Sequence, residues 1–265
     1  MNPFLMEETQ FLGPARAEYK FNPRRLVQST VVGLTTRAVA VLCFLIAFDV
    51  FTPPGQANVD PFFKRDVQIV SFGAGVFFTV FGLMTFLHSY RNRKTRVRLY
   101  ADAVAYSRGR NTTICHWDDV AEVWETKALI DNASTSSCKL LLTDGRTLKF
   151  TNEFFKDEDI DELQAVLLQE TFEPLWRRTA TIYENGGTVG FGPYRVSRDG
   201  LTWGNWSIWW NDIRNFHVDN PRRQWTMVTH QNRWLTVPFN KMPNVAVFLA
   251  LMHGVLEYER ATQAS

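Results

Sequence analysis

The side chains of this chain that could do chemistry are scattered, and their spacings suit no known catalytic or metal-binding motif. Five histidines occur, none at a metal-ligand spacing: His88, His116, His217, His230 and His253. His116 stands alone on one face of an expected strand, where a histidine is more often structural than catalytic. The sequence has no nucleophile elbow, phosphate-binding loop or zinc-protease motif. We therefore expect no enzyme, no metal site and no cofactor.

Two further groups of side chains have plainer explanations than catalysis. Asp118, Asp119 and Asp212 each follow a tryptophan closely, which is typical of carboxylates that accept hydrogen bonds in turns. The glycine-rich stretch at residues 186–190 opens an expected strand and not a helix, so it does not predict a phosphate cradle.

Tryptophans are concentrated in the last third of the chain. Six of the nine lie close together there: Trp203, Trp206, Trp209, Trp210, Trp225 and Trp234. Alternation along strands accounts for some of them as core residues. The surplus predicts either a buried contact between two β units, which we favour, or an apolar groove for a ligand or peptide. An enzyme with its site in this region is an alternative.

The elements that must position these residues begin with two apolar runs. Residues 67–87 carry no charge, and about 20 apolar residues are enough for a helix to cross a bilayer. Residues 31–51 contain Arg37 and Asp49, both toward the ends of the run, where a charge costs less. With a Pro-rich loop at residues 52–55, they predict a transmembrane hairpin over residues 26–90, with spans at about 29–51 and 67–88. A re-entrant or interfacial first segment is the alternative.

The charges beside the hairpin predict its orientation. Basic residues precede the first run, and five more follow the second: Arg91, Arg93, Lys94, Arg96 and Arg98. In the connecting loop, Lys64 and Arg65 are offset by Asp60 and Asp66. The excess of basic charge on the two outer flanks places both termini in the cytoplasm, with the basic segment at the lipid surface. Three cysteines without a Cys-x-x-Cys pattern fit a reducing compartment.

Small residues form a stripe along the second run. Ser71, Gly75, Thr79 and Gly82 are spaced by four, four and three positions, so they share one helix face where another backbone could approach closely. The face packs on the first helix or makes a homo-oligomer contact. The second possibility leaves open a small oligomeric membrane assembly as an alternative function.

After residue 98 the chain changes to short alternating strands with turns. Asp144-Gly145 and Gly204-Asn205 are two-residue hairpin turns, and the second would bring Trp203 opposite Trp206. We expect a polar loop at residues 131–137, a helix that ends near Phe172, and a strand at residues 180–183. Residues 1–25 are expected to form a flexible tail.

The sequence after residue 97 is predicted to contain two copies of one structural unit. Three motifs recur in order: Asp102-Ala103-Val104 with Asp199-Gly200-Leu201, Trp117-Asp118-Asp119-Val120 with Trp210-Asn211-Asp212-Ile213, and Asp144-Gly145-Arg146 with Gln231-Asn232-Arg233. The predicted fold class is therefore α+β. A transmembrane hairpin is followed by two tandem β units, at residues 97–173 and 178–261, each closed by a C-terminal helix.

This unit resembles the pleckstrin-homology-like (PH-like) domains of bacterial membrane proteins, most of them of uncharacterised function, although Ala103 replaces the usual glycine. The resemblance implies a bacterial inner-membrane protein and a scaffold more than a ligand site. Headgroup binding in the wider superfamily depends on a basic loop near the first hairpin, where this chain has Arg108 and Arg110. The expected function is a membrane-anchored cytoplasmic binding or scaffold protein of unknown ligand, with lipid, a protein partner or another copy as partner. The net charge of +2 does not favour nucleic acid.

Overall fold

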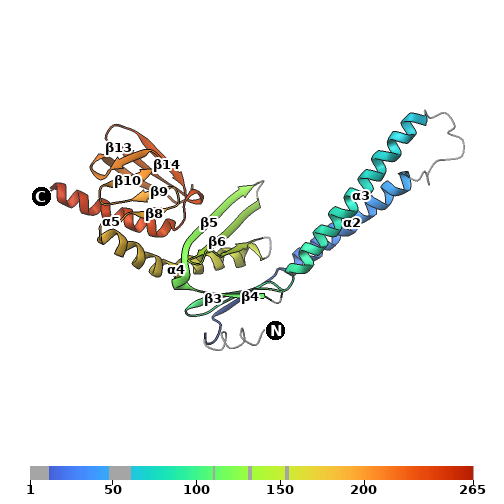
Figure 1. Cartoon of the computed structure of the whole chain (residues 1–265), viewed down its shortest axis with the longest axis horizontal. Helices are drawn as coiled ribbons and strands as arrows, with labels where there is room; N and C mark the ends of the chain where they lie inside the picture. Colours follow the sequence, from blue (N-terminus) through green and yellow to red (C-terminus); the bar gives the residue numbers. More distant parts are fainter. Residues whose placement is uncertain (1–11, 48–60, 110, 131–132, 153–154, 265) are drawn as a thin grey trace. The chain divides into compact units, whose positions relative to one another are not determined.

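The computed structural model describes residues 12–47, 61–109, 111–130, 133–152 and 155–264 (Figure 1). The chain separates into two compact units. We call residues 20–96 together with Ser107–Asn111 the helical unit, and the described residues up to Tyr19, Val97–Tyr106 and those from Thr112 onward the β body. The protein contains both helices and antiparallel sheets, in agreement with the α+β prediction.

The helical unit contains two long apolar helices. Helix α2 spans Pro23–Ala47 and α3 spans Pro61–Asn92, each starting at a proline, which has no N–H to leave unpaired in the first turn. Val27–Ala47 and Arg65–Asn92 are long and apolar enough to cross a membrane. The predicted loop at residues 52–55 and Asp49 lie outside the described residues.

The glycines of the small-residue stripe pack against α2. A Cβ placed on Gly75 would lie 3.0 Å from the ring of Phe44, and one on Gly82 would lie 3.4 Å from the carbonyl oxygen of Gly33. Thr79 donates its hydroxyl to the carbonyl of Gly75, at 2.8 Å. The two glycines of the stripe therefore pack on the first helix, which was one of the two roles predicted for the stripe.

The β body begins with a four-stranded sheet, ordered β1-β2-β3-β4, and a three-stranded sheet, ordered β5-β6-β7. The strands are β1 Ala17–Lys20, β2 Arg96–Leu99, β3 Ala103–Arg108, β4 Asn111–His116, β5 Val120–Ile130, β6 Ala133–Leu142 and β7 Thr147–Thr151. The short 3-10 helix η1, Trp117–Asp119, joins the two sheets, and helix α4, Asp157–Glu184, follows them. We call β1 to α4 the first half.

The second half repeats this order of elements. Its sheets are ordered β11-β10-β9-β8 and β12-β13-β14. The strands are β8 Val189–Phe191, β9 Tyr194–Val196, β10 Gly200–Trp203, β11 Trp206–Trp209, β12 Ile213–Asp219, β13 Gln224–Thr229 and β14 Trp234–Pro238. The 3-10 helix η2, Trp210–Asp212, joins the sheets, and after the short η3, Phe239–Lys241, helix α5, Val245–Ala264, ends the chain.

Backbone hydrogen bonds recur at corresponding positions of the two halves. In the first half, Trp117 N donates to Asp102 O (3.1 Å), Thr143 N to Asp119 O (2.8 Å) and Gly145 N to Leu142 O (2.9 Å). In the second half, the corresponding donors and acceptors are Trp210 N and Asp199 O (3.3 Å), His230 N and Asp212 O (2.9 Å), and Asn232 N and Thr229 O (2.9 Å). Gly145 and Asn232 both have positive φ, at 85° and 57°. The two motif tryptophans are both buried, and both donate an indole N–H to a backbone carbonyl at 3.0 Å.

The helical hairpin α2–α3 connects two strands of the first half whose counterparts in the second half are joined by a tight turn. In the second half, β8 and β9 are joined by only Gly192 and Pro193. In the first half, the corresponding connection, between β1 and β2, contains α2 and α3. Two residues separate β1 from α2, and three separate α3 from β2. The prediction of a flexible tail over residues 1–25 was thus wrong for Ala17–Lys20, which form a strand, and for residues 23–25, which begin α2. Residues 1–11 lie outside the described residues.

Three local predictions fail in the β body. Helix α4 does not end near Phe172 but continues through Pro174 to Glu184, so the strand predicted at residues 180–183 is helical. The helix continues because residues on both sides of the proline are buried, among them Leu167 and Leu175, and packing outweighs the lost hydrogen bond. The polar loop predicted at residues 131–137 is mostly strand β6, paired with β5, and residues 131–132 lie outside the described residues.

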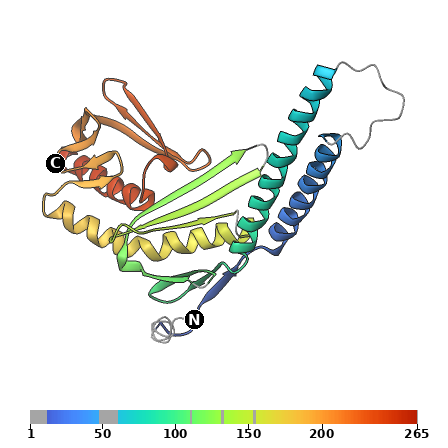
Figure 2. The same ribbon diagram turned by 45° about the vertical axis from the view of Figure 1, so that its right-hand side comes forward.

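Helix α4 also connects the two halves. Figures 1 and 2 show it passing beneath β5 and β6 and continuing to the second half, where it contacts β8 and α5. Asn244 adds a backbone contact at the edge of β5: its N–H donates to Val123 O at 2.8 Å, and its Oδ1 accepts from Val123 N at 2.7 Å. Arg223 pairs with the buried Glu125, which also accepts from Gln164 Nε2 at 3.1 Å. One continuous apolar core results.

Candidate functional site

A tight hairpin forms one wall of the candidate site. Gly204 takes a positive φ of 55° in the turn between β10 and β11, and the register pairs Trp203 with Trp206. Their indole rings are stacked, with centroids 6.4 Å apart and planes 21° apart. Both the turn and the facing tryptophans were predicted from Gly204-Asn205. Tyr194 on β9 lies behind Trp203, with ring centroids 6.4 Å apart, and supports it from the core side.

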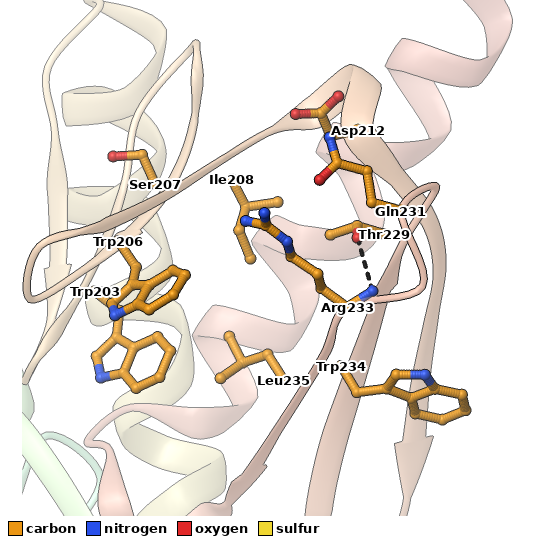
Figure 3. A pocket seen from close by; sticks show the side chains of 10 residues that line it. All are labelled: Trp203, Trp206, Ser207, Ile208, Asp212, Thr229, Gln231, Arg233, Trp234 and Leu235. Atoms are coloured by element: carbon orange, nitrogen blue, oxygen red, sulfur yellow. Dashed lines mark hydrogen bonds between the residues drawn. The ribbon is translucent and has the colours of Figure 1, made fainter.

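The turn between β13 and β14 forms the opposite wall. Thr229 and Arg233 exchange two hydrogen bonds: Thr229 N donates to Arg233 O at 3.0 Å, and Arg233 N donates to the Thr229 hydroxyl at 3.1 Å. This closed turn holds the start of β14 in place. Figure 3 shows the Arg233 side chain extending from the turn into the space between it and the tryptophan pair.

A pocket of about 670 Å³ lies between these walls. It is lined by Trp203, Trp206, Ser207, Ile208, Asp212, Thr229, Gln231, Arg233, Trp234 and Leu235 (Figure 3). Its volume falls in the range of about 300–1,000 Å³ that is usual for ligand sites. Apolar walls with a few polar groups, including one cation and one carboxylate, suit an amphipathic ligand.

A second hollow of about 450 Å³ adjoins the pocket and shares Asp212 with it. Its lining is largely polar, with three carboxylates and one guanidinium: Arg198, Asp199, Trp209, Trp210, Asn211, Asp212 and Glu259. The surface around the tryptophans is therefore concave and polar at its margin.

The six clustered tryptophans divide into two groups. Trp210 and Trp225 are core residues, 4% and 0% exposed. Trp203, Trp206, Trp209 and Trp234 are 38%, 59%, 55% and 72% exposed, so they do not form the buried contact between β units that we favoured from the sequence. That contact uses Asn244, Glu125 and Arg223 instead. Three of the four exposed indoles line the pocket, and whether it is a groove for a ligand or peptide stays a prediction.

The predicted basic segment is exposed throughout: Arg91, Arg93, Lys94, Arg96 and Arg98 all face solvent. The guanidinium of Arg93 lies over the ring of Tyr90, 3.8 Å from its centroid. Arg108 donates from Nε to Oδ1 of the buried Asn92 at 2.8 Å, so the predicted headgroup loop meets the end of α3. Arg110 lies outside the described residues. In the β body, a hydrogen bond from Arg98 to Glu18, 3.0 Å long, raises the pKa of Arg98.

The buried thiols are poor candidates for nucleophiles. Burial raises the pKa of Cys115 to about 12, and burial also raises the pKa of Cys138 to about 12. Both side chains therefore stay protonated near neutral pH, and a thiol reacts as its thiolate. Within the described residues, no three His, Cys, Asp or Glu side chains are grouped so that they could hold a metal ion.

Sequence reasoning missed the most informative polar residue of the pocket, Arg233. The signal was present in the repeated motif, where Asp144-Gly145-Arg146 is matched by Gln231-Asn232-Arg233 and the acidic partner of the arginine is lost.

Comparison with known families gives one match. The model of a family of unknown function, DUF6585, matches residues 5–261, which is nearly the whole chain. A search of curated proteins finds no match.

Proposed function

The chain belongs to the DUF6585 family, and we propose that it is a membrane-anchored binding protein without catalytic activity. In this proposal α2 and α3 cross the bilayer of a bacterial inner membrane, and both termini are cytoplasmic. The two halves of the β body are tandem PH-like units, and they bind a partner at the membrane surface.

The position of the hairpin carries the proposal. Helices α2 and α3 replace the β1–β2 turn, with linkers of two and three residues. A linker of that length spans at most about 7–11 Å. A β unit tethered at both ends by such linkers would be held against the headgroup layer, whichever way it faces.

Charge and topology support the same function. The exposed cations of the basic segment lie in the last turn of α3, in the linker after it and in β2, and each would gain about 1 kcal/mol near an anionic lipid surface. The sequence of a four-stranded sheet, a 3-10 turn, a three-stranded sheet and a helix occurs twice, with matched hydrogen bonds. That arrangement supports the PH-like resemblance of both halves and a binding role for them.

The rival membrane assembly depends on the small-residue stripe. Gly75 and Gly82 already contact α2, so a homo-oligomer would have to use other parts of the stripe, such as Ser71, or another helix face. The rival enzyme would use the tryptophan-lined pocket. Both rivals predict results that the anchored binding protein does not: an oligomer in detergent, or turnover of a substrate.

A topology experiment tests the proposal. Reporters that are active on only one side of the membrane are fused after the last residue and inserted in the loop near residue 56. We expect the terminal reporter to be active in the cytoplasm, the loop reporter to be active outside, and the protein to resist alkaline extraction. Release by alkali, or a terminal reporter active only outside, would contradict the proposal.

A further inference from the structure

The two halves provide a matched comparison around the pocket. Cys115 and Leu148 of the first half correspond in the repeat to Ile208 and Leu235 of the second. The first pair is closed off from solvent, at 1% and 6% exposed, whereas the second pair is half-buried and lines the pocket. A surface that is closed in one half is therefore open in the other, with large indoles around it.

The charge at this surface also differs between the halves. In the first half, the Arg146 guanidinium forms an ion pair with the Asp144 carboxylate. The backbone N–H of Arg146 also donates to Asp144 Oδ1 at 2.8 Å, and this hydrogen bond is the main reason that the pKa of Asp144 is lowered. In the second half, Gln231 replaces that carboxylate. Within the described part of the chain, the Arg233 guanidinium has no ion pair or side-chain hydrogen bond. An arginine in a concave apolar site can bind a carboxylate from a ligand in a bidentate manner.

Open strand edges border the same pocket. β11 and β14 are each the last strand of their sheet, and both supply lining residues. An edge strand presents unpaired backbone N–H and C=O groups, to which an extended peptide can add as a further strand. Side chains of such a peptide would alternate, so every second one could enter the pocket between the Trp203–Trp206 pair and Leu235.

We propose that this pocket binds an extended peptide segment with aromatic or aliphatic side chains at alternate positions and one acidic side chain that pairs with Arg233. The inference rests on the proposed binding function and names its partner class. A bilayer fits the surface less well, although exposed tryptophans often lie in membrane interfaces. The adjoining hollow has three carboxylates, Asp199, Asp212 and Glu259, against the one guanidinium of Arg198, so a continuous anionic headgroup layer over both hollows would be repelled. A single acidic side chain placed at Arg233 meets only the Asp212 carboxylate in the pocket itself.

A peptide selection tests this inference on the full chain in lipid nanodiscs. A random linear peptide library is selected against the protein, with empty nanodiscs as the background. We expect enriched sequences with apolar side chains at alternate positions and a neighbouring Asp or Glu. A synthetic peptide of that sequence should lose at least about tenfold in affinity when Arg233→Glu is introduced, since the charge-assisted hydrogen bond to its acidic side chain is lost and replaced by repulsion.

The repeat supplies the control. Arg146→Glu changes the same charge at the matched position of the first half, where the surface is closed, and should leave peptide affinity unchanged. Selection on Arg233→Glu should favour basic peptides in place of acidic ones.

Three outcomes would overturn the inference. They are no enrichment above empty nanodiscs, equal binding to the Arg233→Glu protein, and a tryptophan fluorescence change with phosphatidylglycerol vesicles but not with peptide. Alkaline extraction of the same proteins separates this test from that of the proposed function. A chain released by alkali refutes the membrane anchor, whereas the peptide results alone decide the occupant of the pocket.

Discussion

Loss of the Arg223 side chain should loosen the contact between the two halves. Glu125 is 7% exposed, lies on β5, and is paired with Arg223 from the turn before β13. In Arg223→Ala, the hydrogen bond from Gln164, at 3.1 Å, would be the one side-chain contact left to the Glu125 carboxylate among the described residues. Removing one partner of a buried ion pair costs about 3–5 kcal/mol.

The side chain of Arg223 is 34% exposed, so the cost should lie at or below the lower end of that range, at about 2–3 kcal/mol. For a body of this size, each 1 kcal/mol lowers Tm by about 2–4 °C, so Arg223→Ala should lower Tm by about 4–12 °C. The measurement is thermal unfolding of the full chain in detergent, followed by near-UV circular dichroism. Its signal comes mainly from the buried aromatic residues.

The double variant Glu125→Gln/Arg223→Ala decides the cause. Without a charge at position 125, no uncompensated carboxylate stays buried, and the double variant should melt above Arg223→Ala. If its Tm falls by the sum of the two single changes, the two side chains are not coupled and the reasoning is refuted. A shift below about 2 °C in Arg223→Ala would refute it as well.

Three further predictions concern the hairpin, the thiols and the repeated tryptophans. Replacing residues 21–95 with Gly-Pro, the connection found between β8 and β9, should give a soluble protein with native near-UV circular dichroism; a protein that still floats with lipid in a density gradient would contradict the role of the hairpin. Cys115 and Cys138, with pKa values raised to about 12, should resist iodoacetamide at pH 8 and react after unfolding, as counted by mass spectrometry. Trp117→Phe and Trp210→Phe each lose one hydrogen bond from a buried indole and should each destabilise by about 1–2 kcal/mol in chemical unfolding; unequal losses would argue against equivalent roles.

The pocket belongs to the second half, whereas the hairpin is inserted in the chain of the first half. The first half carries the hairpin at its β1–β2 connection, and its surface around Leu148 is closed. The second half has a two-residue turn at that connection and an open pocket. In our proposal the first half holds the protein at the membrane, and the second binds its partner.

Local sequence determined the elements whose signals are short-range. Residues 67–87 carry no charge and are mostly apolar, so a long apolar helix there follows from composition alone. Gly204-Asn205 forms the predicted two-residue turn, whereas the turn that contains Asp144-Gly145 is longer, because β6 ends at Leu142 and β7 begins at Thr147. Both glycines take a positive φ, which costs a glycine little. The stacked Trp203 and Trp206 then follow from the register of the hairpin.

Only the tertiary structure decided the features that depend on distant partners. Ala17–Lys20 is four residues long and has no periodic signal; it is a strand because β2, beyond the whole hairpin, pairs with it. Helix α4 passes through Pro174 because buried contacts on both sides outweigh a local breaker. The sequence did not decide whether the clustered tryptophans lie in the core, in a contact between the β units or in a groove. The burial of a side chain depends on what packs against it and not on its residue type. Comparison of the repeated motifs already shows that Gln231 replaces the acidic partner of the arginine. Only the folded turn shows that the Arg233 side chain extends into a pocket.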